Sequence, residues 1–446
     1  MSTAPADRTP PGGRDRRGMT GLLTAVGISI LGTRMSFLAL PWFVLTTTHS
    51  AVDTGLIAFA EMAPYVLTQA LGGPYVDRLG AWRTSVVGDL GAAAAVGLVP
   101  LLHLLGLLPL QVLALVMAIA GVLRGAGDAA RNVMVPGLGE FAGQPMERSA
   151  GLYDGVNRLA GLIGAPLAGV LIATVSALTV LAIDAATFLA SALTVLALVP
   201  RRAQPQPAPG AGPGASELGY LTSLREGFAF LRGDRLLLGI ASMVLVTNLI
   251  DQASSSVLTP VWAQQVAHSP IALGLIGGAF GLGAVTGNAA TTWLGPRLPR
   301  RWTFAVGFAL AGAPRLVALA VASSVSPVLV VAVLGGLGAG GLNPILGAVE
   351  YERVPRALQA RVLGAVGAAA WAGIPVGGLV GGALVGGFGL RAALGTAAAA
   401  YALTTAAPFV FPVWKQMDRQ PDSPTSPARS RPLLSTSATP SGQGPR

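Results

Sequence analysis

Long apolar stretches recur along the chain, separated by short polar segments rich in arginine, proline and glycine. A helix needs about 20 mostly apolar residues to cross a bilayer. Residues 112–122 are continuously apolar and do not alternate with polar residues, which argues against transmembrane strands. The pattern therefore predicts an all-α integral membrane protein with twelve transmembrane helices. We expect spans at about 20–46, 52–72, 84–107, 110–136, 148–173, 177–199, 236–261, 270–294, 302–323, 326–349, 358–386 and 389–412.

These spans fall into two sets of six. Between the sets, residues 201–218 form a Pro/Gly/Ala tract that cannot pack a core and is typical of a linker. The segment that follows has apolar residues on one helical face, which favours either an interfacial amphipathic helix or an extension of the seventh span. The predicted organisation is a disordered cytoplasmic tail at 1–19, a six-helix bundle at 20–199, a cytoplasmic linker with an amphipathic helix at 200–235, a second six-helix bundle at 236–412 and a disordered cytoplasmic tail at 413–446.

The arginines predict the orientation, because cytoplasmic loops of membrane proteins carry an excess of positive charge. Arginines gather in the N-terminal tail, in the loop between spans 2 and 3, in the central linker and in the loops after spans 8 and 10. On the other side, only Arg391 breaks the absence of Arg and Lys. We therefore expect both termini in the cytoplasm.

Composition limits the function. Only 11% of residues are charged and the mean hydropathy is +0.64, far from a soluble protein. The net charge of +10 comes from scattered arginines, which argues against nucleic-acid binding. The chain has no cysteine and three well-separated histidines, so we expect no metal site. The sequence GLGAGG at 336–341 fits a dinucleotide fingerprint, but it lies within a predicted span and favours helix packing.

One polar hairpin, GGPYVDRLGAWR at 72–83, interrupts the apolar pattern between spans 2 and 3. A weaker counterpart, WLGPRLPRR at 293–301, keeps the arginines but has no acidic residue. Glycines permit tight turns, and an acidic side chain can bind the N-terminus of a neighbouring helix. Trp82 in this hairpin is expected to be an interfacial anchor. The residues that stand out in this hairpin are Gly73, Asp77, Arg78, Gly80 and Arg83.

A glycine- and proline-containing motif, GLIGAPLAG at 161–169, lies in the fifth predicted span, and GIPVGG at 373–378 takes the equivalent place in the second set. The key positions are Gly161, Pro166 and Gly169. Glycines permit close helix packing, and proline weakens or bends a helix. Two six-span repeats place a substrate site between them, near the middle of the bilayer.

Together, these features resemble the major facilitator superfamily over residues 20–412. The segments LREGFAFLRGDR and AIDAATFLASAL are similar to the exporter group that contains macrolide efflux pumps and the enterobactin exporter. The sequence departs from the family pattern at Trp82, where a basic residue is usual, and at Ala165, where a glycine precedes the proline. The resemblance implies that Gly73, Asp77, Arg78, Gly80 and Arg83 form a conformational latch. In it, Asp77 meets the start of span 11 and closes the cytoplasmic side in the outward-facing state. The resemblance also implies that span 5 carries an antiporter motif and that spans 1, 4, 7 and 10 line the cavity.

Ionisable residues within spans are functional candidates, because each costs at least about 2.5–3.5 kcal/mol at the bilayer centre. Some have structural explanations: Asp154 and Arg158 could pair at i,i+4 spacing, Asp184 could hydrogen-bond a neighbouring helix, Asp89 could be satisfied near the cytoplasmic boundary, and Arg131 could snorkel. The remaining candidates for a proton or substrate cavity are Arg34, Glu61, Arg124, Asp128, Asn248, Asp251 and Asn343. As the proton-coupling carboxylate we favour Asp128 or Asp251, then Glu61, with a structural ion pair as the alternative.

The leading functional hypothesis is a secondary active transporter that exports a small hydrophobic or amphipathic compound, such as a drug, antibiotic, siderophore or other natural product. It would work by proton antiport and alternating access. The alternative is an importer or facilitator of a nutrient such as a sugar or organic acid. A membrane enzyme would need a catalytic set that the sequence lacks. We expect a monomer in the plasma (inner) membrane whose partners are a small-molecule substrate, protons and lipid, with the proton gradient and no cofactor.

Overall fold

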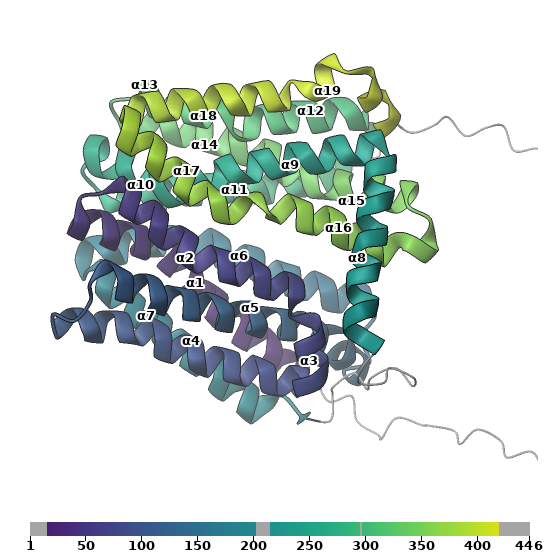
Figure 1. The fold of residues 1–446 in the computed structure, drawn as a ribbon, viewed down its shortest axis with the longest axis horizontal. Helices are drawn as coiled ribbons and strands as arrows, with labels where there is room; N and C mark the ends of the chain where they lie inside the picture. The colour runs from purple at the N-terminus through teal and green to yellow at the C-terminus, as the bar shows by residue number, and fades with distance from the viewer. Residues whose placement is uncertain (1–15, 202–214, 295–296, 419–446) are drawn as a thin grey trace, which may run out of the picture.

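The computed structural model describes residues 16–201, 215–294 and 297–418, and the regular elements in these ranges are all helical. The helices form two groups, one above the other in Figure 1. The lower group, residues 17–198, is the N-terminal half, and the upper group, residues 235–417, is the C-terminal half. The predicted all-α fold with two bundles is confirmed.

Six long helices and one short helix make up the N-terminal half. Ser50 and Ser176 begin two of the long helices, where their side chains accept hydrogen bonds from the backbone N–H groups of Asp53 and Thr179. The elements are α1 (Arg17–Thr48), α2 (Ala51–Leu71), α3 (Gly73–Leu79), α4 (Ala81–Leu104), α5 (Leu110–Phe141), α6 (Met146–Thr174) and α7 (Ala177–Leu198).

Spans in the C-terminal half are more often interrupted. The seventh span contains two π-helical turns. The ninth, tenth and eleventh spans are each divided into two helices, with a glycine at or next to each break. The elements are α9 (Arg235–Ala253), η2 (Ser254–Leu258), α10 (Thr259–Trp262), η3 (Ala263–Ala267), α11 (Pro270–Leu294), α12 (Arg300–Ala311), α13 (Ala313–Val321), α14 (Val325–Gly340), α15 (Leu342–Arg353), η5 (Arg356–Leu358), α16 (Gln359–Trp371), α17 (Gly373–Phe388), α18 (Leu390–Thr405), α19 (Ala407–Val410) and η6 (Pro412–Met417).

The observed spans lie close to the predicted ones, with the largest differences at the ends of the fourth and seventh, which continue to Phe141 and Ala267. Within the described ranges, 11 helical segments are long and apolar enough to cross a membrane. The one predicted span that is not among these 11 is the second, at 52–72, which corresponds to α2 and carries Asp53 and Glu61. Its 21 residues extend about 30 Å, the thickness of the hydrocarbon core, and it packs along α5 and α17.

The two halves meet at one end of the molecule. We call the end where α1 begins and η6 ends the terminal end, and the other the opposite end. Near the opposite end, a Cβ atom at Gly55 of α2 would lie 2.2 Å from the carbonyl oxygen of Gly378 in α17. Likewise, a Cβ at Gly169 of α6 would lie 2.9 Å from Cα of Gly274 in α11. Backbone therefore touches backbone across the halves, and glycine is what permits it.

The glycines of the GLGAGG sequence also serve helix packing. A Cβ at Gly336 of α14 would lie 2.1 Å from the carbonyl oxygen of Phe280 in α11, and one at Gly340 would lie 2.2 Å from that of Ala284. The predicted packing role is confirmed.

The linker helix α8 (Ala215–Gly233) crosses the terminal end at a steep angle to the spans (Figure 1). It packs against α16, where Glu226 forms an ion pair with Arg361. Asp234 separates it from α9 and caps that helix by accepting hydrogen bonds from Leu236 N at 2.9 Å and Leu237 N at 3.1 Å. The amphipathic helix is therefore a separate element and not a continuous extension of the seventh span. Residues 202–214 lie outside the described ranges.

Trp82 is not the interfacial anchor that we expected. Its side chain is 6% exposed and packs in the core at the terminal end. The indole N–H donates to the carbonyl oxygen of Val199 at 3.0 Å, and the Arg201 guanidinium lies 4.4 Å from the ring centroid. Trp82 thus joins the start of α4 to the end of α7.

The C-terminal bundle extends beyond the predicted boundary at 412. Trp414 of η6 is 2% exposed and stacks on Phe304 of α12, with ring centroids 5.8 Å apart. The bundle therefore includes residues to Met417, so the tail predicted at 413–446 does not begin at 413, and residues 419–446 lie outside the described ranges. Which end faces the cytoplasm stays a prediction from the arginine bias.

The contact at the opposite end can be tested by cross-linking, since the chain has no cysteine of its own. A Cβ at Gly386 would lie 2.7 Å from Cγ2 of Val52, which places the two Cβ atoms within disulfide reach. We expect oxidised V52C/G386C to form a cross-link between the halves, seen by mass spectrometry as the loss of both free thiols. V52C combined with Leu403→Cys, on an exposed face of α18, should form none. Failure of the first pair to cross-link would contradict the closed opposite end.

Candidate transport cavity

A cavity of about 440 Å³ lies between the halves. Its lining residues come from α1, α2, α5 and α6 on one side and from α9, α16 and α17 on the other. In α2, α5 and α6 these residues lie in the half of the helix nearer the terminal end, away from the glycine contacts. The lining residues are Ile30, Thr33, Arg34, Phe37, Met62, Tyr65, Val66, Gln69, Arg124, Asp128, Asn132, Tyr153, Asp154, Asn157, Gln252, Trp371 and Ile374.

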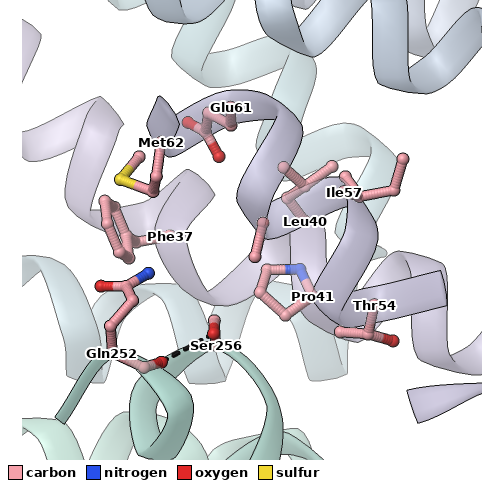
Figure 2. Close-up of a pocket in the computed structure, with 10 residues that line it drawn as sticks. Phe37, Leu40, Pro41, Thr54, Ile57, Glu61, Met62, Gln252 and Ser256 are labelled. Atoms are coloured by element: carbon pink, nitrogen blue, oxygen red, sulfur yellow. Dashed lines mark hydrogen bonds between the residues drawn. The ribbon is translucent and has the colours of Figure 1, made fainter. Parts of the chain in front are cut away.

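A much smaller pocket adjoins this cavity on the side of the opposite end (Figure 2). Its volume of about 10 Å³ is room for about one water molecule. Phe37, Met62 and Gln252 line both spaces and lie beside one another in Figure 2. These three side chains therefore form the floor that separates the cavity from the closed end. Glu61 lines the small pocket from α2.

The central ion pair joins Arg124 of α5 to Glu61 of α2. Both are buried, at 4% and 8% exposed. The Arg124 guanidinium also lies 5.7 Å from the ring centroid of Tyr65 and 5.9 Å from that of Phe188. A buried charge needs such neighbours, because removing one partner of a buried pair leaves an uncompensated charge. Arg124 also lines the large cavity, so the pair lies between the two spaces.

A second carboxylate, Asp184 of α7, interacts electrostatically with the same guanidinium. Asp184 is fully buried and accepts a hydrogen bond from Ser36 Oγ of α1 at 2.5 Å and one from Thr187 Oγ1 at 3.3 Å. The predicted hydrogen bond to a neighbouring helix is confirmed. Helical spacing could not indicate that Asp184 and Glu61 would both interact with Arg124, because the three residues lie on three helices. The buried group thus contains two carboxylates and one guanidinium.

A second buried network lies nearer the terminal end. Arg131 Nη1 donates to both carboxylate oxygens of Asp89, at 2.6 and 2.8 Å, and Nη2 donates to Asp128. Ser191 Oγ donates to Asp89 at 2.6 Å, and Tyr65 Oη donates to Asp128 at 3.0 Å. Two expectations are wrong here. Arg131 does not snorkel, since it is 1% exposed, and Asp89 is equally buried and held by Arg131 and not by loop arginines or boundary water.

Arg34 enters the cavity from the middle of α1 and is exposed there. Two glycines of α6 make room for it: a Cβ at Gly164 would lie 2.6 Å from Arg34 Cβ, and one at Gly161 would lie 3.8 Å from Nε. Further along the fifth-span motif, Pro166 packs against Gly278 of α11, where a Cβ would lie 2.5 Å from Pro166 Cγ. The motif therefore shapes both the cavity wall and the closed end.

The polar residues expected in the C-terminal half are not brought together. Asn248 Nδ2 donates to the carbonyl oxygen of Ala370 at 2.8 Å and so ties α9 to α16. Asp251 pairs with Arg315 of α13 at 3.0 Å and is not on the described cavity lining. Its neighbour Gln252 faces the cavity instead. Asn343 is exposed at the start of α15 and is likewise absent from the described lining.

A family model described as Major Facilitator Superfamily matches residues 22–268 and 244–440. The chain belongs to this superfamily. It is 29% identical over 405 residues to the multidrug efflux pump Tap of Mycobacterium tuberculosis (strain ATCC 25618 / H37Rv), covering 90% of this chain and 95% of that one. It is 28% identical to the multidrug efflux pump Tap of Mycolicibacterium fortuitum, covering 81% and 87%.

Solved structures show the same fold at low sequence identity. The nucleoside transporter NupG matches with a TM-score of 0.69 at 14% identity, covering 89% of this chain and 100% of that one. A bacterial homologue of the lysosomal transporter Spinster, solved in an inward-facing and unoccupied conformation, matches with a TM-score of 0.64 at 13% identity, covering 92% and 100%. The predicted membership and the multi-pass membrane location are confirmed.

The superfamily's loop motif lies at the terminal end, around α3. Gly80 has φ 85°, a backbone conformation that favours glycine, while Gly73 has open space beside it. Arg78 and Arg83 are exposed, and the side chain of Asp77 lies outside the described residues. The main contacts of α3 are with α2, α4 and α5 of its own half.

The counterpart in the C-terminal half has fixed partners. Arg300 donates to both oxygens of Glu352, at 2.5 and 2.7 Å. Arg301 donates to the carbonyl oxygens of Pro408 at 2.8 Å and Phe409 at 3.2 Å. These arginines therefore hold α12, α15 and α19 together within one half.

Two arginines of this transporter allow a matched stability test. Arg131 is buried with two carboxylates, whereas Arg158 forms an i,i+4 pair with Asp154 at 2.6 Å on a surface where the side chains are 35% and 60% exposed. Replacing Arg131 with Gln leaves buried carboxylates unpaired and should cost about 3–5 kcal/mol. Arg158→Gln should cost about 0–1 kcal/mol. Unfolding of the purified variants in detergent measures both, and equal losses would contradict the buried network.

Proposed function

We propose that this chain exports small hydrophobic or amphipathic compounds across the plasma membrane in exchange for protons. The observation that carries the proposal is its similarity, over 90% of its length, to transporters named multidrug efflux pumps. The cavity supports it, since its volume of about 440 Å³ and its mixed lining, with apolar and aromatic side chains beside charged and amide groups, suit an amphipathic, drug-sized ligand. A nutrient importer is not favoured by these relatives.

Export would proceed by alternating access. The glycine contacts between α2 and α17 and between α6 and α11 hold the opposite end closed, while the cavity lies towards the terminal end. With the termini in the cytoplasm, as the arginine bias predicts, this is the state that receives substrate from inside the cell. Opening the opposite end would require these glycine contacts to separate, and the hairpin around α3 would then close the cytoplasmic side.

Proton coupling would use the group formed by Arg124, Glu61 and Asp184. Arg124 is paired with Glu61 and Asp128 with Arg131, whereas Asp184 forms no ion pair with a residue that the structure describes. The group of Arg124, Glu61 and Asp184 is therefore electrically neutral only when it holds one proton. Removing that proton leaves a net negative charge in a buried site, which is costly at this depth in a membrane. Glu61 and Arg124 lie at the boundary between the two spaces, where a proton could be exchanged with either side, while Asp184 is fully buried on α7. We therefore propose Glu61 and Asp184 as the coupling carboxylates, ahead of Asp128 and Asp251.

Drug uptake into inverted membrane vesicles tests this assignment. We expect wild-type uptake of dyes and antibiotics to stop when the pH gradient is collapsed. Glu61→Gln and Asp184→Asn should lose at least about tenfold in gradient-driven uptake, because each removes a carboxylate from the buried group. The matched control is Glu147→Gln, an exposed residue at the start of α6. Wild-type uptake that does not change when the pH gradient is collapsed would contradict proton coupling. Full gradient-driven uptake in both variants would contradict the assignment of Glu61 and Asp184 as the coupling carboxylates.

Substitutions in the loop motif around α3 should lower the transport rate more than substitutions in its counterpart in the C-terminal half. We expect Asp77→Ala to lower the initial transport rate about two- to tenfold, through loss of an acidic residue that would bind a helix N-terminus. Arg300→Ala should have a smaller effect, because its partner Glu352 lies within the same half. Initial rates at equal protein levels measure this, and equal effects would contradict a one-sided latch.

A further inference from the structure

One charged side chain on the cavity lining, Arg34, forms no ion pair with a described residue, and its electrostatic neighbours Tyr65 and Asp128 have other partners. Three of the four charged residues on the cavity lining are paired: Arg124 with Glu61, Asp128 with Arg131, and Asp154 with Arg158. The fourth, Arg34, forms no hydrogen bond or ion pair with any residue that the structure describes.

An unpaired arginine at this position costs free energy, because α1 is a membrane span and Arg34 lies near its middle. A charge at that depth costs at least about 2.5–3.5 kcal/mol unless it is satisfied. In the same half, Arg124 donates a hydrogen bond to the carboxylate of Glu61, and Arg131 donates to those of Asp89 and Asp128. The chain thus satisfies its other cavity charges internally and leaves the Arg34 guanidinium available to a ligand.

The residues around Arg34 leave its guanidinium uncovered in the cavity. Gly161 and Gly164 remove side chains from the face of α6 that Arg34 passes, so the guanidinium reaches the cavity without a covering residue. Phe37 and Tyr65 line the same cavity from the N-terminal half, and Trp371 faces it from α16. A flat apolar body can lie between such aromatic walls, while a guanidinium binds a carboxylate with two parallel hydrogen bonds.

We propose that Arg34 binds the acidic group of the transported compound, so that the substrates include weak organic acids with an aromatic or apolar body. The inference rests on the proposed export function, because it places the substrate in the same cavity. Under this inference, Arg34 makes the affinity for an acid higher than the affinity for its neutral analogue. An arginine with a purely structural role would not produce this difference.

Matched probes test this role: 1-naphthoic acid and its neutral amide, 1-naphthamide. Binding to the purified full chain in nanodiscs is measured by calorimetry. We expect the acid to bind wild type more tightly than the amide. Arg34→Gln should weaken binding of the acid about tenfold or more and leave the amide unchanged, since a charge-assisted hydrogen bond is lost. Arg34→Lys should restore part of the affinity, because it keeps the charge but not the planar fork.

The matched control is Arg235→Gln, which removes an exposed arginine at the start of α9 outside the cavity and should change neither affinity. Equal weakening of acid and amide by Arg34→Gln would overturn the inference, and so would failure of the acid to bind wild type. Drug uptake in vesicles separates the two proposals. If wild type exports the drug panel but does not prefer the acid, only this inference fails; if it exports nothing, the proposed function fails.

Discussion

The rest of the site depends on the ion pair that the buried guanidinium of Arg124 forms with Glu61. The guanidinium lies buried in the N-terminal half, paired with Glu61 of α2, close to Asp184 of α7 and beside the rings of Tyr65 and Phe188. A bare charge at this depth is too costly to leave unpaired. The requirement to surround it therefore constrains how α2, α5 and α7 pack, and it buries one more carboxylate than the single guanidinium can neutralise.

Close backbone contact supplies the second constraint. Glycines let α2 touch α17 and α6 touch α11 near one end only, so the cavity lies towards the other. The fifth-span motif joins the two constraints, because Gly161 and Gly164 shape the cavity around Arg34 while Pro166 and Gly169 pack into the closed end. A rearrangement of the closed end would therefore also move the residues of the cavity wall around Arg34.

Sequence reasoning predicted the spans and the superfamily well, because membrane thickness sets the length of an apolar helix. It was weaker for the site, since helical spacing shows which residues share a face but not which helix they meet. Asp154 and Arg158, on one helix, were paired correctly, whereas the partners of Arg131 lie partly on α4 and were missed. Asp251 was predicted for the cavity, yet it pairs with Arg315, and its neighbour Gln252 lines the cavity instead.

The most direct test of the account asks whether the Arg124 group holds a proton. Infrared difference spectra of the purified protein, recorded between acidic and alkaline pH, show a band for each protonated buried carboxyl group that titrates. The account predicts a band in wild type that is lost or shifted in both Glu61→Gln and Asp184→Asn and kept in Glu147→Gln. A spectrum that is the same in wild type and in both buried variants would contradict it.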